Sequence, residues 1–416
     1  MSHISKIKLL FSSRQKPTPL DTAAFFFSGG HMGIFTLALP FVIMLIGGSD
    51  KDLGLCFGLG TIAYLISCLT VAKHLDRFSP KRTLQFSSMF IASAFVMIFI
   101  CTRMFLAGKL PFGPVLTITI INILSCLALA LFWPPMMGWV SIGHEGPTLS
   151  KRMGIFNSSW SLALVVSPLI AGYIIQIDPT IAVLTASVFV VAAFIAISVA
   201  REPENHNNFN SPSDKHQELA ETTHPLNGAF SSMTRLALVT GSLVIALFRT
   251  QFALLFTENL GFSKPQFGIV TTMFCLANFI GFYVTGKTKN WHHKLTPVIV
   301  SQLMTAAAML IIIFARSLLS LYTAAIFIGI SQSFIYSSHQ FYCVSGKANR
   351  SGSMALHEIL IAAGYATGSL AGGYLAEYLS RYWPYGFALA AILIAIAIQV
   401  VIFTNHKKTL TRIQAT

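Results

Sequence analysis

Long apolar stretches alternate with short polar ones along almost the whole chain, and each apolar stretch has the length of one membrane-crossing helix. Residues 181–200, IAVLTASVFVVAAFIAISVA, carry no charge, and about 20 such residues cross roughly 30 Å of hydrocarbon. The pattern predicts an all-α polytopic membrane protein with twelve spans, at residues 20–47, 53–73, 83–102, 112–140, 152–177, 179–200, 235–260, 265–286, 295–315, 318–345, 353–379 and 382–404.

A long hydrophilic stretch interrupts this pattern between the sixth and seventh spans. It reads REPENHNNFNSPSDKHQELAETTHPLNG from residue 201 and is rich in Asn, Ser, Pro, His and acidic residues, a composition typical of linkers. We therefore predict an N-terminal six-helix bundle at 1–200, a linker at 201–234 and a C-terminal six-helix bundle at 235–416. The two bundles are expected to be pseudo-symmetric.

The basic residues orient the spans. Of the 28 Lys and Arg residues, 21 lie at the two termini, in the linker and in the loops on the same side. Six lie in the opposite loops, and Arg249 lies within a span. Because loops rich in Lys and Arg stay in the cytoplasm, both termini and the linker are predicted to be cytoplasmic. The protein is then integral to the cytoplasmic (inner) membrane.

Composition narrows the function classes. The chain is 54% hydrophobic and 10% charged, against about 25% charged residues in soluble domains. The net charge of +14 is spread between the spans, which argues against nucleic acid as a partner. The six cysteines include no CxxC pair, so we expect free thiols, with no disulfide framework, metal site or cofactor. The basic N-terminus followed by a long apolar run predicts an uncleaved first span.

The fifth and eleventh spans repeat one another. Residues 153–173, MGIFNSSWSLALVVSPLIAGY, and 354–374, MALHEILIAAGYATGSLAGGY, match at four positions and carry small residues about every fourth residue. Such residues, including Gly368 and Gly372, give a flat helix face on which another helix packs closely. Glycines are common in any membrane helix, but their occurrence in equivalent spans favours a repeat, and two repeated six-span halves are typical of transporters. His31 in the first span corresponds loosely to Arg249 in the seventh.

Two motifs carry a resemblance to a known family. The loop AKHLDRFSPKR (72–82) keeps Asp76, Arg77, Lys81 and Arg82 of the pattern Gly-x-x-x-Asp-Arg-x-Gly-Arg-Arg/Lys, although alanine and serine replace its glycines. Over its whole length the sequence resembles the major facilitator superfamily, whose plan has twelve spans, a cytoplasmic linker and cytoplasmic termini. The resemblance implies a transporter whose first, fourth, seventh and tenth spans line a central cavity.

The second motif is similar to the pattern of the drug:proton antiporter branch. Residues 163–172 keep Pro168 and Gly172 of Gly-x-x-x-Gly-Pro-x-x-Gly-Gly. The fourth span, however, lacks the arginine that many proton antiporters of this family carry there, and Pro134–Pro135 predict a break in it. The resemblance implies gating roles for both motifs and for the glycines of the eleventh span. A surface ion pair is the alternative for Asp76 and Arg77.

Arg249 is the first candidate for chemistry. It lies in the apolar run VIALFRTQFALLF (244–256), 14 residues after Arg235, which is about 20 Å along a helix. A guanidinium at that depth must face protein or water. Binding an anionic group, or pairing with Glu358, is the functional interpretation, and a scaffolding role is the alternative.

Glu358 is the second candidate, because it is the one acidic residue clearly inside a span. It lies about 9 Å from the start of the eleventh helix, where proton coupling together with His357 and His339 is the functional interpretation. A structural ion pair, or contact with cytoplasmic water, is the alternative. For His31 and His339 the alternative is a hydrogen-bonded contact between helices.

These observations predict a secondary active transporter that moves a small molecule by alternating access. The predicted substrate is an organic anion or a partly anionic molecule, the coupling ion is a proton, and the protein is a monomer in the lipid bilayer. Candidate substrate-binding residues lie in the central spans: Arg249, His31, Gln251, Gln332, Tyr336, Asn122 and Trp160.

Two alternatives stay open. One is a multidrug or metabolite efflux antiporter, and the other is a non-transporting membrane sensor built on the same scaffold. An enzyme is not expected, because the sequence contains no HExxH motif, phosphate-binding glycine loop or nucleophile–base constellation.

Overall fold

The computed structural model describes residues 18–71, 78–109, 113–142, 146–202, 225–288, 290–344 and 350–415. Within these ranges the chain is helical and contains twelve spans that are long and apolar enough to cross a membrane. The all-α fold with twelve membrane spans is thereby confirmed.

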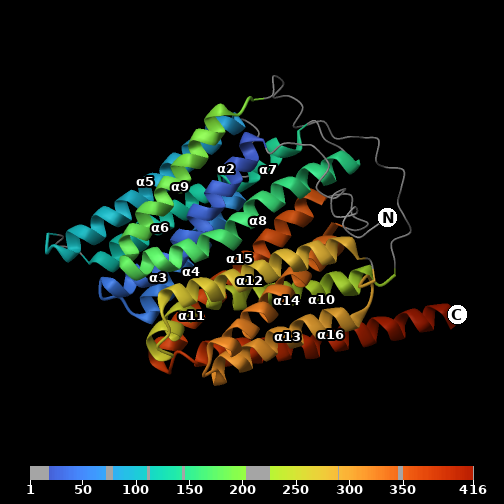
Figure 1. Ribbon diagram of the computed structural model, residues 1–416. Coiled ribbons are helices and arrows are strands. Elements are labelled where there is room, and N and C mark those ends of the chain that lie inside the picture. The colour runs from blue at the N-terminus through green and yellow to red at the C-terminus, as the bar shows by residue number, and fades with distance from the viewer. Residues whose placement is uncertain are drawn as a thin grey trace, which may run out of the picture.

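The first six spans form one half of the molecule, drawn from blue to green in Figure 1. Their elements are α2 (Pro19–Phe27), η1 (Ser28–Phe35), α3 (Thr36–Leu45), α4 (Asp50–Val71), α5 (Pro80–Leu106), α6 (Pro114–Leu129), α7 (Trp133–Ser141), α8 (Gly146–Ile177) and α9 (Pro179–Val199).

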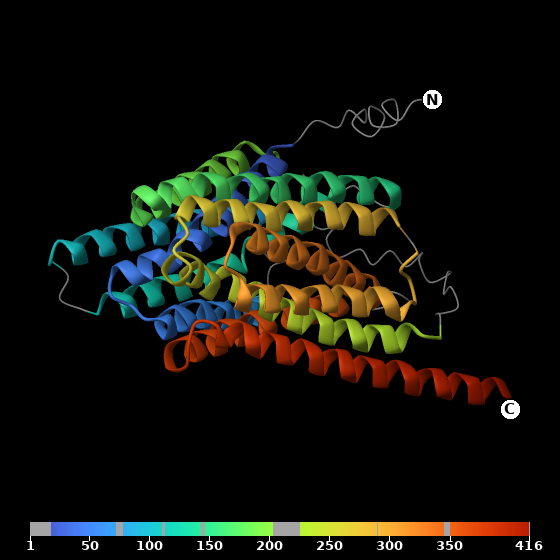
Figure 2. The same cartoon turned by 60° about the horizontal axis from the view of Figure 1, so that its bottom comes forward.

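The last six spans form the other half, drawn from yellow to red. Their elements are α10 (Asn227–Arg249), α11 (Gln251–Leu254), η4 (Leu255–Asn259), α12 (Lys264–Lys287), α13 (Leu295–Phe314), α14 (Leu318–Val344), α15 (Arg350–Tyr378) and α16 (Trp383–Ala415). Below, the linker end is the end of the bundle that carries residues 202 and 225, and the far end is the opposite one. At the linker end α16 continues past the other helices toward the C-terminus (Figure 2).

The seventh span starts earlier than predicted. Residues 227–234, which the sequence analysis assigns to the linker, form the first two turns of α10. They are polar, yet Asn227, Ser231 and Thr234 are buried, and the Asn227 amide oxygen lies 2.6 Å from a ring nitrogen of His293. The Asn227 and Thr234 side chains have hydrogen-bond partners within the protein. A polar segment that is buried in this way gives no sign in its hydropathy that it belongs to a span.

Three spans are not continuous α-helices. In the first span η1 is a π-helix, which widens the backbone around His31, and the fourth span breaks at residues 130–132, directly before Pro134–Pro135. The seventh breaks at Thr250, whose φ of −104° and ψ of −78° end α10. The break in the fourth span is the predicted one. Interrupted helices within a membrane are tolerated where protein or a cavity surrounds them.

The first and seventh spans are the central helices. In their most apolar windows 78% and 83% of the residues are buried inside the protein, whereas the other ten spans within the described residues have 22–50%. The remaining spans therefore supply most of the surface that faces lipid, in addition to their contacts inside the protein.

The two halves meet where glycines allow backbones to touch. A Cβ added to Gly54 of α4 would lie 2.8 Å from the Cα of Gly373 in α15, and one added to Gly268 of α12 would lie 2.4 Å from the carbonyl oxygen of Pro168 in α8. Figure 2 shows α8 and α12 running side by side. These two crossings hold the halves together.

A buried ion pair fastens the first span inside the N-terminal half. Arg152 of α8 contacts the Asp21 carboxylate at 2.6 Å, and both side chains are less than a tenth exposed. The second Nη of Arg152 donates to the Thr18 hydroxyl at 2.9 Å. Removal of one partner would leave the other charge buried and unpaired.

We expect Arg152→Met to lower the free energy of unfolding by about 3–5 kcal/mol, because it strands the Asp21 carboxylate. The matched control is Arg103→Met, which breaks the Arg103–Asp178 pair, where the Arg103 side chain is 48% exposed; it should cost at most about 1 kcal/mol. Thermal unfolding of both variants in detergent, followed by tryptophan fluorescence, measures the difference. Equal shifts of Tm would contradict the assignment.

Candidate functional site

Arg249 lies at the break of the seventh span. It is the last residue of α10. The hydroxyl group of Thr250, the next residue, donates to the Ala246 carbonyl at 2.8 Å. The residues before Arg249 are buried in the C-terminal half, whereas the Arg249 side chain is only partly buried. The break thus directs a permanent cation away from its own bundle.

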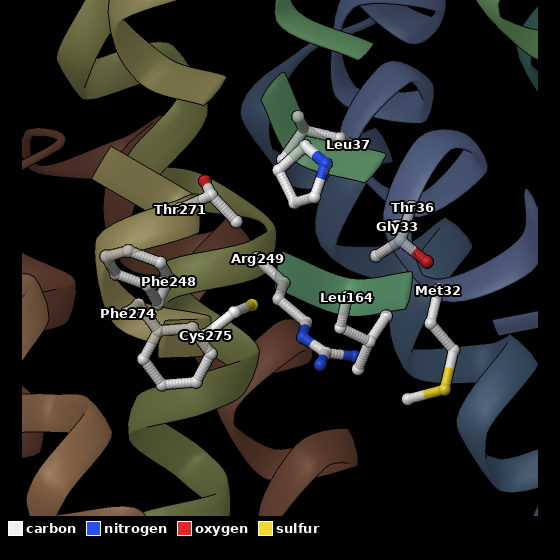
Figure 3. Close-up of a pocket in the computed structure, with 11 residues that line it drawn as sticks. Met32, Gly33, Thr36, Leu37, Leu164, Phe248, Arg249, Thr271, Phe274 and Cys275 are labelled. Carbon is white, nitrogen blue, oxygen red and sulfur yellow. The ribbon is translucent and has the colours of Figure 1, made fainter. Parts of the chain in front are cut away.

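That cation enters a small cavity between the two halves. The cavity has a volume of about 20 Å³, roughly the space of one water molecule. Figure 3 shows Arg249 extending between Cys275 on one side and Leu164 and Met32 on the other. The lining is Met32, Gly33, Thr36, Leu37, Leu164, Pro168, Phe248, Arg249, Thr271, Phe274 and Cys275. Both halves contribute, through η1, α3 and α8 on one side and α10 and α12 on the other.

No carboxylate neutralises Arg249 within the described residues. Its guanidinium carbon lies 5.9 Å from the centre of the Tyr365 ring, a cation–π contact. Its charge also reaches His31 of the opposite half. His31 is 9% exposed, and its Nδ1 has no hydrogen-bond partner in the described part of the chain. The correspondence of His31 and Arg249 in the two repeats stays a prediction.

Gln251 follows directly after the break and points toward the N-terminal half. It is fully buried, and its amide nitrogen donates to the Asp50 carbonyl of α4 at 3.3 Å. Its amide oxygen has no partner among the described residues. Gln251 thus belongs to the contact between the halves rather than to the cavity lining.

A second polar cluster lies inside the C-terminal half. The Nδ1 atoms of His339 and His357 are 2.7 Å apart, and both rings are buried. In such a contact one Nδ1 carries a hydrogen and donates it to the other Nδ1, which carries none. The Tyr336 ring packs edge-on against His357 at 4.7 Å.

Glu358 lies beside this cluster, at the boundary with the N-terminal half. Its charge acts on Tyr64 and Cys68 of α4 and on Tyr336 of α14. It has no ion pair within the described residues. It precedes Tyr365, the neighbour of Arg249, by seven residues, which is about 10 Å along α15. Arg249 and Glu358, for which pairing was one prediction, therefore form no ion pair in the described part of the structure.

Three other predicted residues have partners within their own half. The Asn122 amide donates to the Cys56 carbonyl at 3.0 Å, and the Trp160 indole donates to the Asn157 side chain at 3.0 Å. Gln332 lies against Gly241 of α10. None of the three lines the cavity at Arg249, and their roles in substrate binding stay predictions.

The predicted gating residues are dispersed. Asp76 and Arg77 lie outside the described residues. Lys81 donates to the Ser198 and Ala200 carbonyls, both at 2.8 Å, so it caps the end of α9 in its own half, and Arg82 is exposed.

The predicted gating glycines and proline face different partners. Pro168 and Gly172 pack against Gly268 of α12 across the boundary, whereas Gly368 and Gly372 pack against α10 inside the C-terminal half. Gly373, one residue further along α15, makes the contact with α4.

An arginine-centred junction at the far end was not predicted. The Arg381 Nε lies 3.0 and 2.9 Å from the two Asp50 carboxylate oxygens. One Nη lies 2.6 Å from a Glu258 oxygen and 3.1 Å from the Asn259 amide oxygen. Asp50 belongs to the N-terminal half and the other three residues to the C-terminal half, so the junction ties the halves together. Their separation in sequence leaves no local pattern that could reveal it.

Other hydrogen bonds between the halves also lie nearer the far end. Within the described residues these join Lys51 to Glu377 and Tyr378, Lys264 to Ile175 and Thr272 to Val165. The structure is therefore the conformation in which the far end is closed.

Comparison with protein families identifies this architecture. The model of the Major Facilitator Superfamily matches residues 22–338 and 236–415, which together cover nearly the whole chain. The chain belongs to the major facilitator superfamily. It is an integral membrane protein and a secondary transporter of a small molecule, working by alternating access between its two halves. Comparison with curated protein sequences finds no matching relative.

Solved structures share the fold. The nucleoside transporter NupG has a TM-score of 0.70 at 8% identity, over 92% of this chain and 98% of that one. A bacterial homologue of the human lysosomal transporter Spinster, inward-facing and occupied, has 0.64 at 13%, over 98% and 97%. A POT family transporter in complex with 5-aminolevulinic acid has 0.69 at 13%, over 94% and 96%. At these identities the likeness extends to the fold alone.

The junction predicts how the far end opens. In a background without the six native cysteines, the buried Ser369 of α15 is replaced by cysteine as a reporter, because its carbonyl lies at the Gly54 crossing. Arg381→Gln should raise the rate at which an impermeant thiol reagent labels Ser369→Cys from the far side by about tenfold, equivalent to about 1.4 kcal/mol. Arg316→Gln, in a neighbouring loop, is the control. Equal labelling in both variants would show that the junction does not hold the far end closed.

Proposed function

We propose that this transporter carries a small organic anion, or a molecule with one anionic group, and that Arg249 binds that group. The observation that supports this most is a guanidinium without a carboxylate partner, located in a cavity that both halves line. A partly buried guanidinium without a counter-charge is unfavourable, and a bound anion would supply that counter-charge. Since rocking of the halves changes the cavity, the anion would be bound and released as they move.

We further propose that the transporter is proton-coupled, with Glu358 as the coupling carboxyl group and the His339–His357 pair beside it. Glu358 lies at the boundary between the halves without a cation partner in the described chain, so movement of α4 against α15 would change its contact with water. A carboxyl group whose solvation changes between conformations binds a proton differently in each. That difference is what coupling requires.

We also propose which membrane holds the protein and how the protein is oriented in it. The distribution of Lys and Arg supports the cytoplasmic (inner) membrane, with both termini in the cytoplasm. The far end of the bundle would then face outward, and this structure would be closed on its outward side. We propose a monomer as the functional unit.

Export of amphipathic compounds is a second candidate. The apolar side chains Phe248, Phe274 and Leu164 around Arg249 suit a substrate with a hydrocarbon part. Vesicles of defined orientation distinguish the two candidates, because an exporter accumulates substrate only when its cytoplasmic side faces the bath.

We expect Arg249→Gln to weaken binding of the transported anion by about 10- to 100-fold. This factor follows because a hydrogen bond to a charged group contributes about 1.5–3 kcal/mol, and each 1.4 kcal/mol changes the dissociation constant about tenfold. A panel of labelled mono-, dicarboxylates and phosphate esters, tested for uptake into vesicles, identifies the anion and its KM. Arg103→Gln, on the protein surface, is the control. Unaltered transport of every anion by Arg249→Gln would refute the anion-binding role.

We expect Glu358→Gln to abolish uphill uptake driven by an imposed pH gradient while exchange of labelled for unlabelled substrate continues. With a permanently neutral side chain the substrate-bound transporter can still change conformation, but the side chain cannot carry a proton. Glu202→Gln, beyond the end of α9, is the control. Should Glu358→Gln still accumulate substrate in response to the pH gradient, the coupling role would be wrong.

A further inference from the structure

We infer that the ligand of the Arg249 site is a monocarboxylate with a compact hydrocarbon body, such as a benzoate-like or branched-chain acid. The inference rests on the proposed function, because it takes an anion at Arg249 as its starting point. It adds how many charges the ligand carries and what the rest of it is made of.

The number of charges follows from the cations that line the site. Arg249 is the one basic residue in the cavity lining, and a guanidinium matches one carboxylate through two parallel hydrogen bonds. A second carboxylate, or the second charge of a phosphate ester, would be buried without a partner, which is strongly unfavourable. The site therefore favours one negative charge.

His31 offers a further polar contact without adding a fixed charge. It lies in the opposite half, within electrostatic reach of Arg249, and its Nδ1 is buried and has no partner in the described chain. The ring packs among Phe27, Phe35 and Phe95, at 5.7–6.0 Å between centres. A neutral imidazole has one N–H to donate to a carboxylate oxygen.

The composition of the lining determines the body of the ligand. Most of the lining side chains are hydrocarbon or thioether groups, and besides Arg249 the polar ones are two threonines and one thiol. A sugar or nucleoside carries many hydroxyl groups, and most of them would lose water without gaining a partner. A hydrocarbon body loses nothing, and the Phe248 and Phe274 rings, 5.2 Å apart, provide a surface for a flat or branched one.

The cavity must open to admit such a molecule. A volume of about 20 Å³ is far below the roughly 300–1,000 Å³ of ligand pockets. The lining divides between η1, α3 and α8 in one half and α10 and α12 in the other, so separation of the halves enlarges it directly. The ligand then contacts Arg249 of one half and the apolar lining of the other.

Cys275 provides a reporter inside this site that does not depend on transport. In a variant that keeps Cys275 and replaces the other five cysteines, a maleimide should label the Cys275 thiol, and an occupant of the site should slow that labelling. The probes are benzoate, its neutral isostere benzamide, and the dianion phthalate. Benzoate is expected to slow labelling about tenfold or more, as a charge-assisted bond to Arg249 implies, while benzamide and phthalate leave it unchanged.

Two substitutions make the test specific. Arg249→Gln should remove the protection by benzoate, and Arg103→Gln should retain it. A ligand-induced rise in Tm of the chain with all six cysteines, measured by tryptophan fluorescence, provides a second readout if the cysteine-replaced protein does not fold.

The outcomes separate the two proposals. Protection by phthalate or a phosphate ester that depends on Arg249, without protection by benzoate, would overturn the monocarboxylate class and leave anion binding at Arg249 intact. Protection by benzamide equal to that by benzoate would overturn the need for the charge. If no anion protects Cys275 or raises Tm in the presence of Arg249, both proposals fail.

Discussion

A guanidinium keeps its charge in a membrane, and this constraint organises the protein around Arg249. Exposure of that charge to hydrocarbon costs between about 2.5 and 17 kcal/mol, depending on the scale, so the seventh span cannot lie at the lipid surface. It lies at the centre, with most of its residues buried, and the first span lies opposite with His31. The guanidinium is accommodated at the boundary between the two halves, both of which line the cavity around it.

The contacts between the halves are of two kinds, and they differ in how they respond to motion. At the Gly54–Gly373 and Gly172–Gly268 crossings, backbones touch without interlocking side chains, so one helix can roll on the other with little steric resistance. At the far end the Asp50–Arg381–Glu258 junction is made of charged hydrogen bonds with fixed geometry. The crossings thus allow rotation, while the junction selects one end point of that rotation.

Hydropathy and charge predict the helices and their number, because a span must be apolar over a fixed length. They also single out Arg249 and Glu358, since a charge in an apolar run stands out. They do not predict where a span begins when its first turns are polar and buried, as at Asn227. Nor do they reveal the π-helix around His31 or the Arg381 junction, because both depend on packing between residues far apart in the chain. The motifs likewise do not predict which residues contact the opposite half. Lys81 caps α9 in its own half, and Gly373 rather than Gly372 contacts α4.

The break at Thr250 has a structural consequence. Arg249, on one side of it, lines the cavity, and Gln251, on the other, holds the backbone carbonyl of Asp50, whose carboxylate grips Arg381. The cavity and the far-end junction are therefore connected through one short backbone segment, residues 249–251. Because α10 ends at Arg249 and α11 begins at Gln251, the two residues do not belong to one continuous helix, and each is placed by the contacts of its own segment.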